Sequence, residues 1–240
     1  MLATPNPLNW YEMPIAENLE HIRNEVADAC ARAHRNPSEV LLMAVSKMHP
    51  AEAIHEAHAA GQQLFGENRV QEMQSKHPQV AALEGIKFHL IGPLQNNKTS
   101  KATEVFSAID TLDSLKTAER LNSAAKELGK VLPVLIEVKL SHEESKHGLA
   151  PTELSALLEA LAPLEHIEAH GLMTVPPWSE DPETARPYFQ QLRRLRDENT
   201  ARFPRLTELS MGMSNDFRIA IEEGSTTIRI GTAIFGKRTP

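Results

Sequence analysis

The 240-residue chain has a single cysteine, Cys30, and few aromatic residues, at 5% of the total. One cysteine cannot form an internal disulfide, so the fold does not require an oxidising compartment. The chain also lacks any run near the roughly 18 uninterrupted apolar residues of a membrane span. Residues 1–14 lack the basic and apolar regions of a secretory signal. We therefore expect a cytoplasmic protein that binds no membrane.

The chain has few positively charged residues relative to negatively charged ones. It contains 25 lysines and arginines and 32 aspartates and glutamates, which gives a net charge of −7. This balance repels a polyanion, so we expect no nucleic-acid partner. A Gly-x-Ser-x-Gly elbow is also absent, which disfavours nucleophilic hydrolysis. Glu52, His55 and His58 share a helix face that we interpret as exposed to solvent, and we predict no metal site.

What the chain does contain is a regular alternation of two patterns. Apolar residues recur at steps of three and four from Ile15 to Ala33, which predicts an amphipathic helix. Short apolar runs bounded by turn residues predict buried strands at 40–45, 64–65, 88–91, 108–112, 134–140, 167–172, 206–210 and 226–230. Helix-like stretches lie between them, at 51–60, 117–128, 151–161 and 183–199.

Alternating strands and helices indicate parallel strands joined by right-handed helical crossovers. No Gly-x-Gly-x-x-Gly motif follows the first strand, so a closed barrel is favoured over the alternative, an open doubly wound sheet. We predict an α/β protein with a single (β/α)8 TIM barrel and an extra N-terminal helix. The barrel forms one domain over residues 1–240, with residues 1–14 as a tail.

Active sites of such barrels lie where the strands end, so the residues directly after each apolar run are the candidates. They are Lys47, Glu67–Asn68, 92–98, Lys139, Met173–Thr174, 210–215 and Gly231–Thr232. Lys47 follows an apolar run, where a low-dielectric wall favours a nucleophilic amine that can form a Schiff base with an aldehyde. The alternative is a structural lysine that extends from the strand end to solvent.

Two segments near the C-terminus have the features of an anion site. In residues 210–216, glycine allows close approach of backbone N–H groups, Ser214 adds a hydroxyl, and Asp216 is expected to cap the helix that follows. The last strand runs into Gly231–Thr232, and barrels often bind phosphate in the loops after strands seven and eight. A plain capped loop is the alternative for the first segment.

Arg229 lies between Ile228 and Ile230 and therefore points to the opposite face of its strand. An arginine directed into a barrel needs an acceptor, because its charge is not lost by deprotonation. The spacing leaves two kinds of acceptor open, a ligand or a carboxylate such as Glu67.

Several motifs between the first strand and the C-terminus form a specific combination. They are 44–47 (AVSK) with Pro50, 65–72 (FGENRVQE), 88–98 (FHLIGPLQNNK), 145–148 (SKHG), 171–173 (GLM), 209–214 (LSMGMS) with Asp216, and 229–236 (RIGTAIFG). This combination resembles the family of pyridoxal phosphate homeostasis proteins, also called proline synthetase co-transcribed homologues. The resemblance implies a barrel similar to the N-terminal domain of alanine racemase, with pyridoxal 5′-phosphate (PLP) held as an internal aldimine on Lys47.

The resemblance also implies which residues contact the cofactor. They are Lys47, Asn68, Met211, Ser214, Arg229, Gly231 and Thr232. Of these, Ser214, Gly231 and Thr232 would hold the phosphate, and Arg229 would face the pyridine nitrogen. Lys98 and Lys146 match other lysines of the family, whereas Lys139 stands where family members often have asparagine.

The implied function is cofactor homeostasis, in which a monomer binds PLP, buffers it and delivers it to PLP-dependent enzymes. An arginine at the ring nitrogen weakens the ring as an electron sink, and racemases that tolerate this need a second base. Tyr11 and Tyr188 do not follow strands, so the sequence holds no complete racemase base pair. The alternative is a single-domain PLP-dependent racemase, deaminase or decarboxylase in which His89 or a substrate group is the base. A barrel that binds another phosphorylated ligand is the third interpretation.

Overall fold

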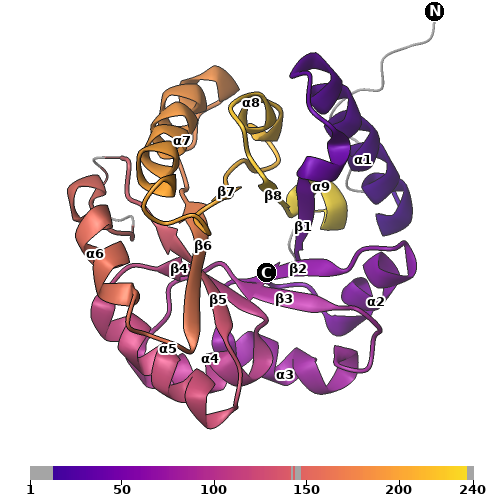
Figure 1. Cartoon of the computed structure of the whole chain (residues 1–240). Helices are drawn as coiled ribbons and strands as arrows, with labels where there is room; N and C mark the ends of the chain where they lie inside the picture. The colour runs from indigo at the N-terminus through magenta and orange to yellow at the C-terminus, as the bar shows by residue number, and fades with distance from the viewer. Residues whose placement is uncertain (1–12, 142, 144–146, 237–240) are drawn as a thin grey trace, which may run out of the picture.

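The computed structural model describes residues 13–141, 143 and 147–236, in which eight parallel strands form a closed ring (Figure 1). Neighbouring strands pair in chain order, and β8 pairs back with β1. The strands are β1 (Leu41–Val45), β2 (Leu64–Glu67), β3 (Lys87–Leu90), β4 (Ala108–Leu112), β5 (Leu132–Glu137), β6 (Ile167–Met173), β7 (Glu208–Ser210) and β8 (Thr227–Ile230).

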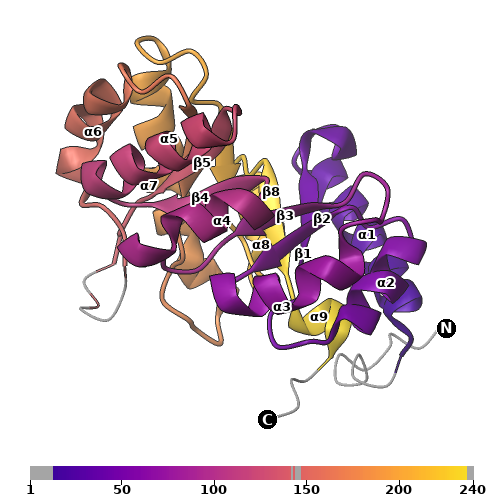
Figure 2. The ribbon, with the colours of Figure 1, turned by 90° about the horizontal axis from the view of Figure 1, so that it is seen from below.

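Helices surround the ring on its outside, and Figure 2 shows α3, α4 and α5 in front of the strands. The helices are α1 (Ile15–Arg32), α2 (Ala51–Ala59), α3 (Val70–Val80), α4 (Thr99–Val105), α5 (Leu115–Glu127), α6 (Leu154–Leu161), α7 (Arg186–Thr200), α8 (Phe217–Glu222) and α9 (Thr232–Phe235). Short 3-10 turns are η1 (Pro37–Glu39), η2 (Asn96–Lys98), η3 (Pro151–Glu153) and η4 (Pro182–Ala185). No helix in the described part of the chain is both long and apolar enough to cross a bilayer.

The predicted (β/α)8 barrel with an N-terminal helix is confirmed. The open-sheet alternative is wrong, because β8 pairs with β1 from Leu41–Thr227 to Ala44–Ile230 and closes the ring. Strand ends differ from the prediction by a few residues. The run at 134–140, for example, is observed as Leu132–Glu137, since Val138 leaves the ladder for an isolated bridge with Leu149.

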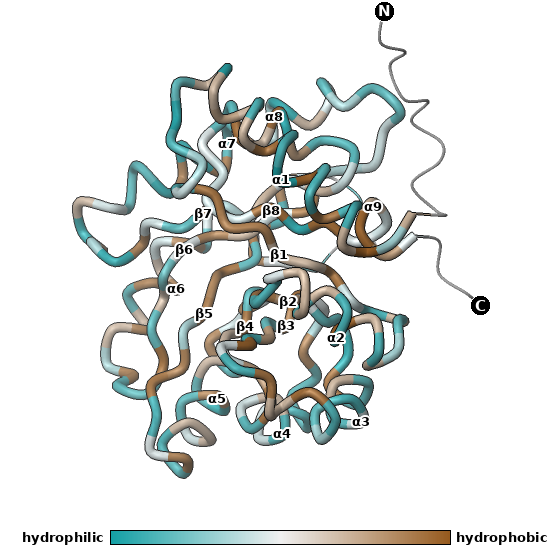
Figure 3. Tube along the Cα trace, turned by 90° about the vertical axis from the view of Figure 1, so that its right-hand side faces the viewer, coloured by the Kyte–Doolittle hydropathy of each residue, from teal (hydrophilic) through white to brown (hydrophobic). Residues whose placement is uncertain are grey.

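The strands read as continuous apolar runs because both of their faces are buried. All of β4 is buried, including the carboxylate of Asp110 inside the barrel. Figure 3 shows hydrophobic segments along the strands and hydrophilic segments along the outer helices. The barrel interior can therefore hold a few charged side chains only where they find partners.

The N-terminal helix α1 turns its apolar stripe inward, with Leu19, Ile22 and Cys30 fully buried. It packs against α8 and α9, and Asn18 Nδ2 donates a hydrogen bond to Ile234 O at 3.0 Å. Helix α1 therefore supports, from outside, the two short helices that follow the last two strands.

Candidate functional site

A cavity of about 450 Å³ opens at the carboxyl ends of the strands. Its wall comes from the segments that follow β1, β2, β3, β6, β7 and β8, and from two strand residues, Val45 of β1 and Arg229 of β8. The predicted residues that line it are Lys47, Asn68, Ser214, Arg229, Gly231 and Thr232. Closure of the barrel thus brings side chains from both ends of the chain into one site.

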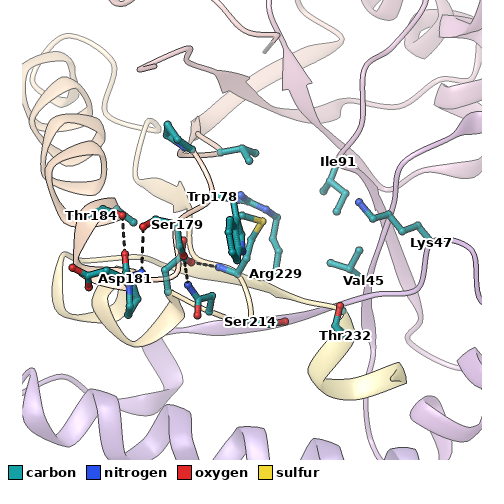
Figure 4. Close-up of a pocket in the computed structure, with 18 of the residues that line it drawn as sticks. Val45, Lys47, Ile91, Trp178, Ser179, Asp181, Thr184, Ser214, Arg229 and Thr232 are labelled. Atoms are coloured by element: carbon teal, nitrogen blue, oxygen red, sulfur yellow. Dashed lines mark hydrogen bonds between the residues drawn. The ribbon is translucent and has the colours of Figure 1, made fainter. Parts of the chain in front are cut away.

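Lys47 is half-buried and extends from the turn after β1 toward this cavity (Figure 4). Val45 and Ile91 flank it with apolar surface. Thr232 and Ser214 belong to the wall made by the last two βα connections. The cavity is therefore bounded by an amine and by two hydroxyls.

The loop between β7 and α8 is fixed at both of its ends. Gly212 has a φ of +98°, and a Cβ there would lie 2.6 Å from the Ala220 side chain, so the loop packs directly on α8. Asp216 occupies the predicted cap position but makes no side-chain bond to the helix amides. Its Oδ1 instead accepts from Met213 N–H at 2.6 Å, because the loop turns back over the helix start. This bond holds the turn that presents Ser214.

Arg229 is buried at 4% exposure and projects from β8 into the site. Its Nη1 donates to Ser210 Oγ at 2.7 Å, and its Nη2 donates to Thr174 O at 2.8 Å. The alternative ion pair with Glu67 is wrong, because Glu67 Oε1 accepts from Ser46 Oγ and from a lysine on α3. The guanidinium is therefore oriented by β6 and β7, not by β2.

Three carboxylates interact electrostatically with Arg229, namely Asp110 on β4, Glu137 on β5 and Asp216 before α8. Burial lowers the pKa of Arg229, while these carboxylates act to raise it. Burial likewise raises the pKa of Glu137 and of Asp216, and Arg229 counteracts that rise. The positive charge of Arg229 is thus offset by carboxylates from three elements.

Asn68 follows β2 and carries a polar atom without an obvious partner. Its Oδ1 is buried, and no described residue donates a hydrogen bond to it. Asn68 also lines an adjoining cavity of about 220 Å³, which Glu137 and Lys139 share. A buried acceptor at a cavity wall is a position that a ligand donor can satisfy.

Other residues singled out from the sequence lie away from this cavity. His89 lines a separate cavity at the amino ends of the strands, where its Nδ1 is 3.0 Å from Asp110 Oδ1. Met211 is fully buried and does not line the main cavity. Lys98 ends η2, and Tyr188 is on α7, and neither lines it.

Tyr11 and Lys146 lie outside the described residues. The helix face with His55 and His58 holds no ligand set, since their Nε2 atoms bond Gln79 O and Glu84 O at 3.0 and 2.9 Å. Among the described residues, no group of three or more metal-ligating side chains could hold a metal ion.

The wall contributed by the β6–α7 connection was not predicted from the sequence. Trp178, Ser179 and Asp181 line the cavity, and Trp178 is 75% exposed at its edge. Asn215 Nδ2 donates to Ser179 O at 2.9 Å and joins this wall to the β7–α8 loop. The sequence did contain a signal, because Trp178 is preceded by two prolines and stands four residues after the flagged strand end at Thr174.

A lysine and an arginine line the cavity together with two hydroxyl-bearing loops, and the family match places this barrel in the alanine racemase N-terminal-domain class. The family described as "Alanine racemase, N-terminal domain" matches residues 18–239. An alanine racemase from Clostridium difficile, only 14% identical, has a TM-score of 0.73 over 93% of this chain and 58% of its own, which shows a shared fold.

Relatives with higher sequence identity identify the family within this class. A pyridoxal phosphate homeostasis protein from Vibrio alginolyticus is 44% identical over 227 residues, covering 93% of this chain and 97% of the relative. The structure of PipY from Synechococcus elongatus with PLP bound is 43% identical, with a TM-score of 0.83 over 92% of this chain and 100% of its own. The chain belongs to the family of pyridoxal phosphate homeostasis proteins.

Proposed function

We propose that the cavity at the carboxyl ends of the strands binds PLP, and that the protein buffers this cofactor and delivers it to PLP-dependent enzymes. The observation that carries the proposal is one cavity of about 450 Å³ lined by Lys47, Ser214 and Thr232. Further support comes from the relatives, which are named for PLP homeostasis, and from PipY, whose structure is described with PLP bound.

The lining suits a ligand that carries an aldehyde, a phosphate and a ring nitrogen. When bound, PLP supplies an aldehyde with which a lysine amine condenses reversibly, releasing one water molecule. Lys47 is that amine in our proposal. The hydroxyls of Ser214 and Thr232 and the backbone of Gly231 hold the phosphate, since hydroxyl and amide groups donate to anionic oxygen.

Arg229 faces the ring nitrogen in this proposal. A guanidinium has several N–H donors, and the bonds to Ser210 and Thr174, at 2.7 and 2.8 Å, fix its plane while other donors are directed elsewhere. Because it stays protonated, it donates to the nitrogen and keeps a proton off it. Asn68 adds a buried acceptor, and Met211 contributes by packing, since it is fully buried.

The proposal needs no second subunit, because all of these residues come from one chain. We therefore expect a monomer in which residues 1–240 act as one domain, and we keep the expectation from the sequence that it is cytoplasmic. Delivery requires that the covalent bond to Lys47 be reversible, and hydrolysis or exchange with an amine of the acceptor enzyme satisfies that requirement.

The test is Lys47→Ala, with Lys101→Ala as the control, because Lys101 lies on α4 and pairs with Glu104 outside the cavity. Wild type and control should show the absorbance of a lysine-bound cofactor, and borohydride reduction with peptide mass mapping should locate the cofactor on Lys47. Lys47→Ala should lose both signals. If both persist in Lys47→Ala, the proposal assigns the wrong residue.

The racemase or deaminase alternative requires a base opposite Lys47. The described lining of the main cavity holds neither tyrosine nor histidine. His147 lines only the adjoining cavity, and His89 lines the separate cavity at the amino ends of the strands. We therefore expect no α-proton exchange when the PLP-loaded protein is incubated with L-amino acids in deuterated solvent. Robust exchange would favour an enzyme over a carrier.

A further inference from the structure

A buried lysine on α3, Lys76, lies behind the turn that carries Lys47. Its side chain is 8% exposed. Its Nζ donates to Ser46 O at 3.0 Å, to Glu67 Oε1 at 2.8 Å and to Glu72 Oε1 at 2.7 Å. An ammonium has three N–H donors, so each donor of Lys76 has an acceptor. The orientation of this side chain is therefore fully determined by its surroundings.

The same network reaches the other side of Lys47. Glu72 Oε1 also accepts from Met48 N–H at 2.5 Å. Ser46 O and Met48 N–H belong to the two peptide groups that adjoin the Cα atom of Lys47. Lys76 anchors the first group directly and the second through Glu72, so both peptide planes at Lys47 are held by one cluster of charges.

The turn itself is strained. Met48 has a φ of +63°, in the left-handed region that residues with a side chain rarely adopt. Its side chain is 55% exposed, so packing of that side chain does not explain the conformation. Strained backbone persists where the surroundings over-determine it, and it concentrates at functional sites. Here two bonds supply that constraint, from Met48 N–H to Glu72 Oε1 and from His49 N–H to Ser46 O at 3.1 Å.

The network also joins two walls of the cavity. Glu67 Oε1 accepts from Ser46 Oγ at 2.8 Å, which ties the end of β1 to the end of β2, where Asn68 lines the cavity. Burial raises the pKa of Glu67, against the effects of Lys76 and Ser46. Burial also acts to raise the pKa of Glu72, but the bonds from Lys76 and Met48 outweigh it and lower that pKa.

A buried ion pair is a weak source of stability, because apolar side chains of similar volume often stabilise a fold equally well. Directed bonds, by contrast, can hold a backbone in one orientation. We propose that Lys76 is a positioning residue, which together with Glu72 sets the direction in which Lys47 projects into the cavity. This inference rests on the proposed function of Lys47.

The experiment compares Lys76→Met with the matched control Lys130→Met. Lys130 also donates to backbone carbonyls, Thr103 O at 2.5 Å and Phe106 O at 3.4 Å, but it does not line the cavity. Glu72→Ala removes the acceptor of Met48 N–H, and Glu72→Gln restores a side-chain oxygen there. Because Glu72 is 21% exposed, these variants supply the test if Lys76→Met fails to fold.

Two ligands distinguish a misplaced Lys47 amine from a generally damaged cavity. PLP reports covalent capture by Lys47 through its absorbance, whereas 4-deoxypyridoxine 5′-phosphate lacks the aldehyde and reports the phosphate and ring contacts by calorimetry. Lys76→Met and Glu72→Ala should weaken covalent capture about tenfold to a hundredfold, the scale of a small misplacement of a reacting group. Both should bind the deoxy analogue as wild type does. Glu72→Gln and Lys130→Met should capture PLP normally.

The outcomes distinguish the two hypotheses. If wild type and Lys130→Met carry PLP on Lys47 while folded Lys76→Met and Glu72→Ala capture it equally well, the positioning role is refuted and the proposed function stands. Equal losses for PLP and for the deoxy analogue would also refute positioning, because they indicate a damaged cavity. Absence of a Lys47 adduct in wild type would refute the proposed function, and this inference with it.

Discussion

Replacing Arg229 with methionine should destabilise the barrel strongly even without a ligand. The guanidinium is 4% exposed and donates to Ser210 Oγ and Thr174 O. Removal of one partner from a buried charge network costs about 3–5 kcal/mol, because the remaining charges lose their compensation. For a chain of this size about 1 kcal/mol shifts Tm by roughly 2–4 °C, so we expect Tm to fall by about 6–20 °C.

The same substitution should make stability depend on pH in a defined direction. Arg229 counteracts the burial that raises the pKa of Glu137 and of Asp216. Without Arg229, these pKa values rise further above their unfolded values of 4.5 and 3.8. A carboxyl with a raised folded pKa destabilises the fold when it is ionised and is relieved as pH falls toward its unfolded pKa. The deficit of Arg229→Met should therefore be larger in mildly alkaline than in mildly acidic buffer.

Urea and thermal unfolding of the unliganded protein across this pH range measure both effects. Arg229→Lys is the matched variant, since it keeps the positive charge but lacks the planar guanidinium that donates to both Ser210 and Thr174 at once. A decrease in the free energy of unfolding of less than about 1 kcal/mol, the effect of an ordinary substitution, would refute the predicted size of the destabilisation. A deficit that stays constant or grows as pH falls would refute the assignment of Glu137 and Asp216 as the uncompensated groups.

Further predictions concern the opposite end of the barrel and the β6–β7 contact. Burial acts to lower the pKa of His89, but Asp110 outweighs it and raises that pKa, so the pair stabilises the fold below the ordinary pKa of 6.5 and loses this contribution as pH rises through the folded value. His89→Gln should therefore lose most stability in mildly acidic buffer, and equal Tm differences on both sides of that pKa would contradict the pairing. Gly171→Ala would place a Cβ 2.1 Å from Glu208 O on β7, so we expect a cost of about 1–3 kcal/mol in unfolding experiments. Wild-type stability of Gly171→Ala would show that β6 and β7 can separate without loss.

Local patterns predicted the strands and much of the candidate site. Buried parallel strands read as short apolar runs, and parallel strands present all of their carboxyl ends at one rim. Residues after those runs, such as Lys47, Asn68, Ser214 and Thr232, were therefore predicted to converge before any contact was known, and they line one cavity. Trp178 was not predicted, because it lies several residues beyond the end of β6 and the candidates were the residues directly after each strand.

The hydrogen-bond and ion-pair partners of charged side chains inside the barrel could not be predicted from local sequence patterns. From the sequence, Glu67 was a possible acceptor for Arg229, yet Glu67 bonds Ser46 and Lys76 whereas Arg229 bonds Ser210 and Thr174. Which of these charged side chains pair depends on how far each strand is shifted along its neighbour in the barrel. Lys76 was not among the residues singled out from the sequence, because nothing in its neighbours along the chain marks it as buried.

By itself the sequence determined the alternation of strands and helices, the class of fold and the rim at which the chemistry lies, since these depend on periodicity and on the polarity of parallel strands. Only the tertiary structure decided which charges pair, that His89 faces the opposite end from Lys47, and that Lys76 holds the turn beside it. The physical reason is that hydrogen bonds and ion pairs act over only a few ångströms. Residues far apart in the chain come within that range of each other only after the ring has closed.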